Sequence, residues 1–130
     1  MKIYLDSCIV IYLIERHPLY AAAIEAKLHT TAPAKLCYTP LVRLECLVMP
    51  YRKNDTGLLG LYESFFKAQT SLDLLPAIFD EAARLRATHK GLKTPDALHL
   101  AAASHHGCTE FWTNDDRLKL TAPGLAVKVI

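Results

Sequence analysis

The sequence predicts an α/β domain of three layers, in which helices cover both faces of a central parallel sheet of about five strands. Short apolar strands alternate with helical segments along the chain, as they do where helices connect parallel strands. Residues 3–5 are apolar without polar alternation, which is typical of a strand buried on both faces. The 130 residues are 52% hydrophobic and 22% charged, which fits one globular domain over residues 1–130.

The first third of the chain predicts two strands and two helices. The first strand ends at Asp6, and Ser7 is the expected N-cap of a helix over residues 8–14. An alanine-rich segment predicts a second helix over residues 19–29. A second strand is expected at residues 35–38.

Two prolines bound the predicted third helix. Thr39 and Pro40 suit the N-cap and the first helical position, and Pro50 is expected to end this helix, which covers residues 41–49. Apolar residues at helical spacing then predict a fourth helix that begins at residue 54 or 55 and continues through residue 66.

The last part of the chain predicts three more strands and two helices. A proline opens one of these helices, and Thr94 is expected to cap the other, which is alanine-rich. The predicted strands cover residues 72–75, 110–113 and 125–130, and the predicted helices cover residues 76–85 and 97–104.

The charge balance and the cysteines exclude several classes of protein. A net charge of +2 without a block of like charge does not by itself indicate a nucleic-acid-binding protein. The four cysteines lack CxxC and zinc-site spacing, so free thiols in a reducing cytoplasm are favoured over disulfides. Neither a secretory leader nor an apolar span of about 20 residues is recognisable, so we expect a cytoplasmic protein without membrane association.

Four of the thirteen acidic residues stand out from the solvated helix faces. Asp6 and Asp115 follow predicted strands, Glu45 lies in an apolar helical segment, and Asp96 lies in the first turn of the last helix. Three of them have simple structural explanations: a dipole-complementing acid for Asp96, turn chemistry for Asp115 and a solvent-facing position for Glu45. Asp6 has no such simple structural explanation, because a carboxylate between two apolar runs needs a partner when it is buried. A cation is therefore expected beside Asp6.

Together these acids predict a metal site. Ligands of open α/β sheets bind at the carboxyl ends of the strands, where Asp6, Asp96 and Asp115 are all expected. Carboxylates gathered there would repel one another unless a hard cation held them. Oxygen ligands without His or Cys favour Mg²⁺ or Mn²⁺ over zinc, and such ions typically serve phosphoryl chemistry.

The acidic segments resemble, in chain order, the motifs of PIN-domain ribonucleases, most closely the VapC-type toxins of bacterial toxin–antitoxin pairs. The resemblance covers essentially the whole chain, and its most specific stretch is Pro-Asp-Ala-Leu-His-Leu-Ala. It rests on Leu5-Asp6-Ser7, Arg43-Leu44-Glu45, Thr94-Pro95-Asp96-Ala97-Leu98-His99-Leu100-Ala101-Ala102-Ala103 and Thr113-Asn114-Asp115. The resemblance implies a five-stranded PIN-like fold, a Mg²⁺ or Mn²⁺ site, endonucleolytic cleavage of RNA, a homodimer and a VapB-like antitoxin partner.

The resemblance also implies roles for individual residues. The family's acidic quartet, catalytic and metal-binding, corresponds to Asp6, Glu45, Asp96 and Asp115. In the implied reaction the metal activates a water for attack on an RNA phosphodiester, and Glu45 orients that water or holds a second ion.

Three further residues are assigned accessory roles. Ser7 corresponds to a family Thr or Ser that steadies the phosphate or a ligand, and Asn114 lies within the Thr-Asn-Asp segment. Asp116 adjoins Asp115, and because the family pattern is Thr-x-Asp, we favour Asp115 as the ligand. Asp116 is then expected to be a helix cap or an accessory residue.

Two other functions and two other groups of residues are also considered. A phosphatase of the haloacid-dehalogenase type needs a second acid two residues after the first, where this chain has Cys8. A non-catalytic protein-binding module predicts that the four acids do not converge.

His99 is three residues after Asp96, and a packed or hydrogen-bonded histidine is favoured over a site residue. Five basic residues offer a possible RNA path, although scattered bases usually form a solvated surface: Arg52, Lys53, Lys90, Lys93 and Arg117.

Overall fold

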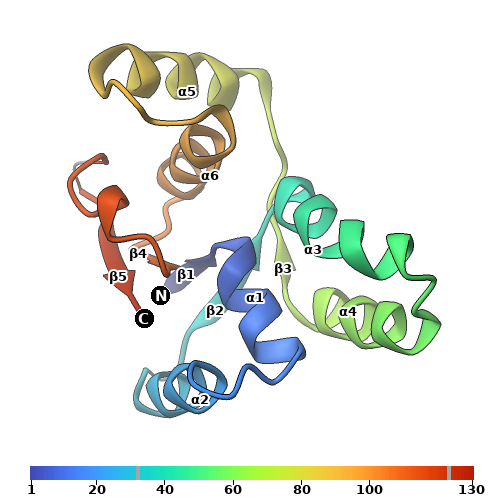
Figure 1. Cartoon of the computed structure of the whole chain (residues 1–130). Coiled ribbons are helices and arrows are strands. Elements are labelled where there is room, and N and C mark those ends of the chain that lie inside the picture. The colour runs from blue at the N-terminus through green and yellow to red at the C-terminus, as the bar shows by residue number, and fades with distance from the viewer. Residues whose placement is uncertain (32, 123) are drawn as a thin grey trace.

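The computed structural model describes residues 1–31, 33–122 and 124–130. Within these residues five parallel strands form one sheet in the order β3-β2-β1-β4-β5, with β1 at its centre (Figure 1). The predicted α/β class with a parallel sheet of about five strands is confirmed. The strands are β1 (Lys2–Leu5), β2 (Lys35–Tyr38), β3 (Thr70–Ser71), β4 (Glu110–Thr113) and β5 (Ala126–Val129).

The helices form a layer on each face of the sheet. The chain steps from β1 through β2 to β3 in one direction and then returns past β1 to β4, so right-handed crossovers place α1 to α4 on one face and α5 and α6 on the other. Figure 1 shows α5 and α6 together on one side of the strands, with α1 and α2 on the opposite side. The helical elements are α1 (Ser7–Ile14), α2 (Ala21–Thr30), α3 (Pro40–Arg52), α4 (Thr56–Ala68), α5 (Pro76–Thr88), α6 (Thr94–His105) and the short 3₁₀ helix η1 (Asp116–Leu118).

The central strand β1 is buried between its neighbours and the helices. Ile3 and Tyr4 are fully buried, as expected for an apolar strand that is covered on both faces. Tyr4 lies opposite Cys37 of β2 and Phe111 of β4, and its ring stacks on that of Phe111 with the centroids 5.2 Å apart. Because β1, β2 and β4 are adjacent and parallel, the residues that follow them meet at one edge of the sheet, which we call the carboxyl-end edge.

Helix α6 brings its first turn to this carboxyl-end edge. The helix leads back to the start of β4, so it runs against the strand direction and begins where the strands end. Its alanines Ala97, Ala101, Ala102 and Ala103 are fully buried, and such small side chains let the helix lie close to its neighbours. The helix packs against α5 and β4 and also contacts α3.

Two predicted boundaries are wrong. The third strand is β3 at Thr70–Ser71 and not residues 72–75, because only the Leu72 N–H continues the pairing, by donating to the Tyr38 carbonyl (2.8 Å), before the chain turns toward α5. Pro50 does not end α3, which continues to Arg52. A proline so near the end of the helix removes one intrahelical hydrogen bond, and the Lys53 N–H still bonds to the Met49 carbonyl (3.0 Å).

The predicted caps of two helices also need correction. Thr94 is the first residue of α6, and the N-cap position belongs to Lys93, which makes no side-chain capping bond. The Thr94 hydroxyl instead accepts a hydrogen bond from the Arg86 guanidinium (2.8 Å). Thr39 does occupy the N-cap position of α3, but its hydroxyl forms no cap bond.

The four cysteines are free thiols, as predicted, and three of them are buried. Among the described residues no helix combines the length and the apolar character that crossing a bilayer requires.

The close packing of α6 generates a stability prediction. Replacing the fully buried Ala102 with Leu should lower the free energy of unfolding by about 1–3 kcal/mol, because the added atoms have no space. The matched change Ala83→Leu, at an exposed position on α5, should have little effect. Urea unfolding of both variants checks this, and equal stabilities would show that α6 is not tightly packed.

Candidate active site

Asp6 joins the end of β1 to the start of α1. Its Oδ1 accepts a hydrogen bond from the Ser7 N–H (2.8 Å), and its Oδ2 accepts one from the Thr113 hydroxyl (2.8 Å). Asp6 is therefore the N-cap residue of α1, and Ser7 is the first residue of the helix, so the prediction that Ser7 is the cap is wrong. An aspartate is as suitable a cap as a serine, and here it occupies the position itself.

The cation expected beside Asp6 is neither a lysine nor an arginine. Asp6 is only 8% exposed, and among the residues that the structure describes no Lys or Arg forms an ion pair with it. The nearest basic group is the imidazole of His99, whose Nε2 lies 4.0 Å from Oδ1. The carboxylate is thus stabilised by neutral donors, and its charge is not compensated by a permanent cation.

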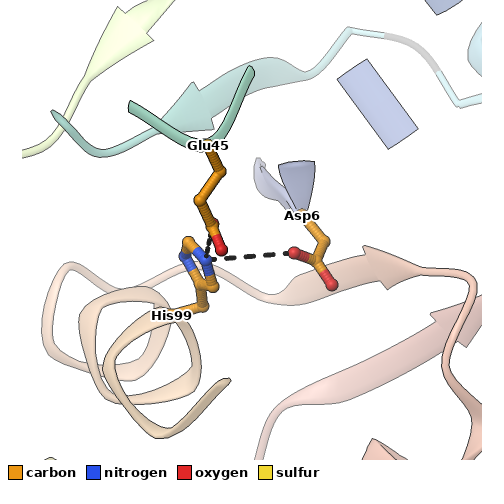
Figure 2. A group of neighbouring side chains, drawn as sticks. All are labelled: Asp6, Glu45 and His99. Atoms are coloured by element: carbon orange, nitrogen blue, oxygen red, sulfur yellow. Dashed lines mark hydrogen bonds and ion pairs between the residues drawn. The ribbon is translucent and has the colours of Figure 1, made fainter. Parts of the chain in front are cut away.

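Glu45 points at the same place from another helix. It lies on α3, which starts directly after β2, and its carboxylate points at His99, beside Asp6 (Figure 2). Its Oε1 lies 2.6 Å from Nε2 of His99, although the two residues are 54 positions apart in the sequence. Ligand atoms of Asp6, Glu45 and His99 all lie within 4.8 Å of one another.

His99 combines the two roles that the sequence allowed, a packed histidine and a residue of the site. It is a buried, hydrogen-bonded histidine, 1% exposed, and it also lies in the site. The sequence signal was its position three residues after Asp96, on the same side of α6. That spacing did not reveal that Glu45 would be its partner, because the contact depends on how α3 meets α6.

Asp96 belongs to the same electrostatic environment. Burial raises the pKa of its carboxyl above the ordinary value, and the negative charge of Asp6 raises it further. The charge of Asp115 acts in the same direction, while His99 and Arg117 act against both. The charges of Asp6 and Asp115 therefore both act on Asp96, although neither Asp96 nor Asp115 belongs to the close cluster of Asp6, Glu45 and His99 among the described residues.

Asp115 differs from the other acids because it has an arginine partner. Its carboxylate accepts hydrogen bonds from Nε (2.9 Å) and Nη2 (2.5 Å) of Arg117, which lowers the pKa of Asp115. It also accepts from the Arg117 N–H (3.0 Å), so Asp115, and not Asp116, is the cap of η1. Its own N–H donates to the Thr113 hydroxyl (3.1 Å), which in turn donates to Asp6.

The remaining sequence candidates have other partners. The Asn114 amide donates to the Tyr12 hydroxyl on α1 (2.8 Å), so its side chain connects β4 to that helix. Asp116 is the exposed first residue of η1. Cys8, at the position where a phosphatase would need an acid, is a thiol whose pKa burial raises to about 11, so it stays protonated.

A cavity of about 550 Å³ opens next to Asp96. Basic side chains border it together with apolar ones, so it offers both charge and contact area. The lining includes His89, Lys90, Leu92, Asp96, Arg117 and Leu118.

The donor chemistry of the site fits a hard divalent cation. Asp6 and Glu45 present carboxylate oxygens within one small space, and Asp6 has no fixed cationic partner among the described residues. Oxygen donors are the ligands that Mg²⁺ and Mn²⁺ prefer. The three-residue cluster also contains an imidazole, which the sequence had not placed among the ligand atoms.

Comparison with protein families gives one match over most of the chain. A model of the PIN domain matches residues 3–122. Comparison of the sequence with curated proteins gives no significant match.

Solved structures with a similar fold include VapBC complexes and a VapC toxin. A VapBC complex of Rickettsia felis bound to a promoter DNA fragment has a TM-score of 0.80 at 16% identity, covering 100% of this chain and 99% of that one. A DNA-bound VapBC of Salmonella typhimurium has a TM-score of 0.74 at 18% identity, with 99% and 98% covered. A sarcin-ricin loop cleaving VapC toxin of Mycobacterium tuberculosis has a TM-score of 0.72 at 13% identity, with 88% and 90% covered. At such identities the likeness shows a shared fold.

The raised pKa of Asp96 gives a prediction about stability. Because folding opposes ionisation of this group, its charge lowers the free energy of unfolding at pH values above the folded-state pKa. Asp96→Asn should therefore be at least as stable as wild type at pH 7 without divalent metal. The difference in free energy of unfolding between the two proteins should shrink as the pH falls through the folded-state pKa of Asp96 toward its ordinary value of 3.8. The wild-type carboxyl is then protonated and uncharged, like the amide of the variant.

Urea unfolding of both proteins at pH 7 and at mildly acidic pH measures this difference. A variant clearly less stable than wild type at pH 7 would mean that Asp96 serves mainly as a helix-start residue.

Proposed function

The chain belongs to the PIN-domain family, and from that premise we propose that it is a metal-dependent endoribonuclease. We further propose that it is the toxin of a type II toxin–antitoxin pair and that it acts in the cytoplasm. The observation that carries the nuclease proposal is the meeting of Asp6 and Glu45, two acids from distant parts of the chain. The proposal that the protein is a non-catalytic module predicts no such convergence.

The four acids have distinct roles in this proposal. Asp6 and Glu45 would hold a Mg²⁺ or Mn²⁺ ion at the end of β1, with Asp96 and Asp115 completing the acidic site. When bound, the ion supplies Lewis-acid stabilisation of charge on the phosphate and makes a water more acidic. Ser7, which follows Asp6 at the first position of α1, would steady the phosphate or a ligand, and Glu45 would also orient the attacking water.

The cavity beside Asp96 supports a polyanionic substrate. Its basic lining suits a phosphate-bearing strand that passes the acidic site, and its leucines offer contact area to a nucleotide. Of the five bases considered in the sequence, two line this cavity, Lys90 and Arg117. RNA is favoured over DNA on the likeness to a VapC toxin that cleaves the sarcin-ricin loop.

The similar VapBC complexes support a VapB-like antitoxin as a partner, and we propose a second copy of this chain as another. One helix also offers a surface for a protein contact. On α3 the apolar side chains of Leu44 and Tyr51 are about 60% exposed, and Leu44, Val48 and Tyr51 border a shallow apolar depression. Exposed apolar side chains that are contiguous often mark an interface.

The first test of the nuclease proposal is its chemistry. The purified protein should cleave single-stranded RNA in Mg²⁺ or Mn²⁺, stop in EDTA, and leave 5′-phosphate and 3′-hydroxyl ends. Asp6→Asn should lower kcat/KM at least about a hundredfold, because it removes a group that holds the metal. Asp80→Asn, an exposed change on α5, is the matched control and should cleave normally.

End-group analysis decides the route of attack. Products with a cyclic 2′,3′-phosphate would show attack by the 2′-hydroxyl and would contradict hydrolysis by an activated water.

The basic lining of the cavity predicts where RNA binds. Lys90→Ala should weaken binding of single-stranded RNA and reduce the slope of log affinity against log salt by roughly 0.7, the value for one lost phosphate contact. Lys67→Ala removes an exposed lysine from α4, away from the cavity, and should leave both quantities unchanged. Fluorescence anisotropy at several salt concentrations in EDTA measures them. Equal slopes of log affinity against log salt for the two variants would show that Lys90, and with it the cavity, does not contact the RNA.

The dimer proposal predicts a specific mass and a specific disruption. Light scattering at micromolar concentration should give twice the 14.5 kDa of one chain. Leu44→Lys should shift the protein to a monomer, since it places a charge in the exposed apolar surface of α3. A wild-type monomer would contradict the proposed dimer without affecting the nuclease proposal.

A further inference from the structure

His99 has a hydrogen-bond partner at each ring nitrogen, and both partners lie in the protein interior or the site. Its Nδ1 lies 2.7 Å from the hydroxyl of Tyr4, and its Nε2 lies 2.6 Å from Oε1 of Glu45. The Tyr4 hydroxyl in turn lies 2.9 Å from the hydroxyl of Thr39. A chain of hydrogen bonds therefore runs from Thr39 through Tyr4 and His99 to Glu45 and links the ends of the central strands to α6 and α3.

The donors in this chain point toward Glu45. An ionised carboxylate only accepts hydrogen bonds, so the proton between Glu45 and His99 belongs to Nε2. Burial raises the pKa of the Tyr4 phenol, which keeps its proton and can donate it to Nδ1 while accepting from Thr39. If the imidazole were fully protonated, Nδ1 would donate to Tyr4 and Tyr4 to Thr39. In both arrangements Nε2–H still donates to Glu45.

The same bonds leave His99 without a lone pair for a metal. A histidine ligand must direct an unprotonated nitrogen at the ion, but Nε2 carries the proton given to Glu45 and Nδ1 faces Tyr4. The distance between Nε2 and Oε1 also argues against a shared ion. Two ligands of one Mg²⁺, each about 2.1 Å from the ion and at right angles to each other, lie roughly 3.0 Å apart. The 2.6 Å between Nε2 and Oε1 is shorter and is that of a charge-assisted hydrogen bond.

We propose that His99 is a positioning residue, which holds the Glu45 carboxylate beside Asp6 by an Nε2–H donation and is not itself a metal ligand. The proposal rests on the proposed function in so far as Glu45 serves the metal site. Glu45 needs such a partner because its side chain is long and 30% exposed, so that without His99 it is free to turn to solvent. With the imidazole occupied, the ion would meet only carboxylate oxygens, which suits Mg²⁺ or Mn²⁺ better than zinc.

The first experiment observes the proton directly. In ¹⁵N-histidine-labelled protein, long-range ¹H–¹⁵N spectra distinguish a protonated ring nitrogen from an unprotonated one by its ¹⁵N chemical shift. The His99 signals are assigned by their loss in His99→Gln or by contacts with the Tyr4 ring. Nε2 of His99 should be protonated without metal and remain so when Mg²⁺ is added. An unprotonated Nε2, or one that loses its proton on Mg²⁺ addition, would overturn the proposal.

The second experiment separates positioning from packing. The amide of Gln reaches the place of Nε2 and keeps a donor for Glu45, whereas the amide of Asn reaches only the place of Nδ1. Mg²⁺ affinity, measured by calorimetry on folded protein, should fall about 10–100-fold in His99→Asn, as is usual when the partner of a ligand is removed, and largely recover in His99→Gln. His29→Asn, on the exposed end of α2, is the control for loss of a histidine.

The outcomes distinguish this proposal from the proposed function. Unchanged Mg²⁺ affinity in His99→Asn, or equal loss in Asn and Gln, would show that His99 does not position Glu45. A wild-type protein that binds neither Mg²⁺ nor Mn²⁺ would contradict the nuclease proposal, while the protonated Nε2 in metal-free protein would still test the hydrogen-bond assignment.

Discussion

The structure is organised around a carboxylate, Asp6, that is nearly buried without a lysine or arginine partner among the described residues. Burying a charge is costly unless donors satisfy it, and here the donors are the first N–H of α1 and the hydroxyl of Thr113. Both come from elements that must be in place beforehand: α1 must start at the end of β1, and β4 must lie beside β1. The charge of Asp6 therefore depends on the correct topology at the centre of the sheet.

The strand order explains why the other acids come to the same edge of the sheet as Asp6. Because β2 and β4 flank β1 in parallel, α3 begins beside Asp6 on one side and Asp115 follows β4 on the other. Helix α6 runs against the strands, so its first turn, with Asp96, arrives at the same edge. The fully buried alanines of α6 let it lie close to the sheet, and its contact with α3 is what joins His99 to Glu45.

The sequence predicted most of the fold because its signals were local. Apolar runs marked four of the five strands at nearly the observed positions, and helical spacing, prolines and alanine-rich segments marked helices α1 to α6 but not the short η1. The errors have equally local causes. The third strand is only two residues long, too short for a periodic pattern, and Pro50 lies where a helix tolerates a proline near its end. Neither Thr94 nor Ser7 caps a helix. The Thr94 hydroxyl is bonded to Arg86, and Asp6 already occupies the cap position of α1 that was predicted for Ser7.

The site was less predictable, because its contacts join residues that are distant in the sequence. Residue type and position relative to strands were enough to select the four acids, and resemblance to PIN-domain motifs supported the choice. Neither source could show that His99 bonds to Glu45, that Asn114 bonds to Tyr12, or that Asp115 has Arg117 as its partner. Such contacts depend on side-chain directions that follow only from the packed structure.

The structure divides the acids into two groups that differ in how their charge is stabilised. Asp6 and Glu45 accept hydrogen bonds from a hydroxyl, a backbone N–H and an imidazole. Asp115 is instead paired with Arg117, whose side chain is 70% exposed and lines the cavity. Solvent and salt screen the Asp115–Arg117 pair, whose arginine is largely exposed, but act little on Asp6, which is nearly buried. An arriving cation would therefore gain most from the inner carboxylates, because the charge of Asp115 is already compensated. Asp96, whose pKa is raised first by burial and then by Asp6, is also affected by the charges of Asp115 and Arg117, so it is coupled electrostatically to both groups.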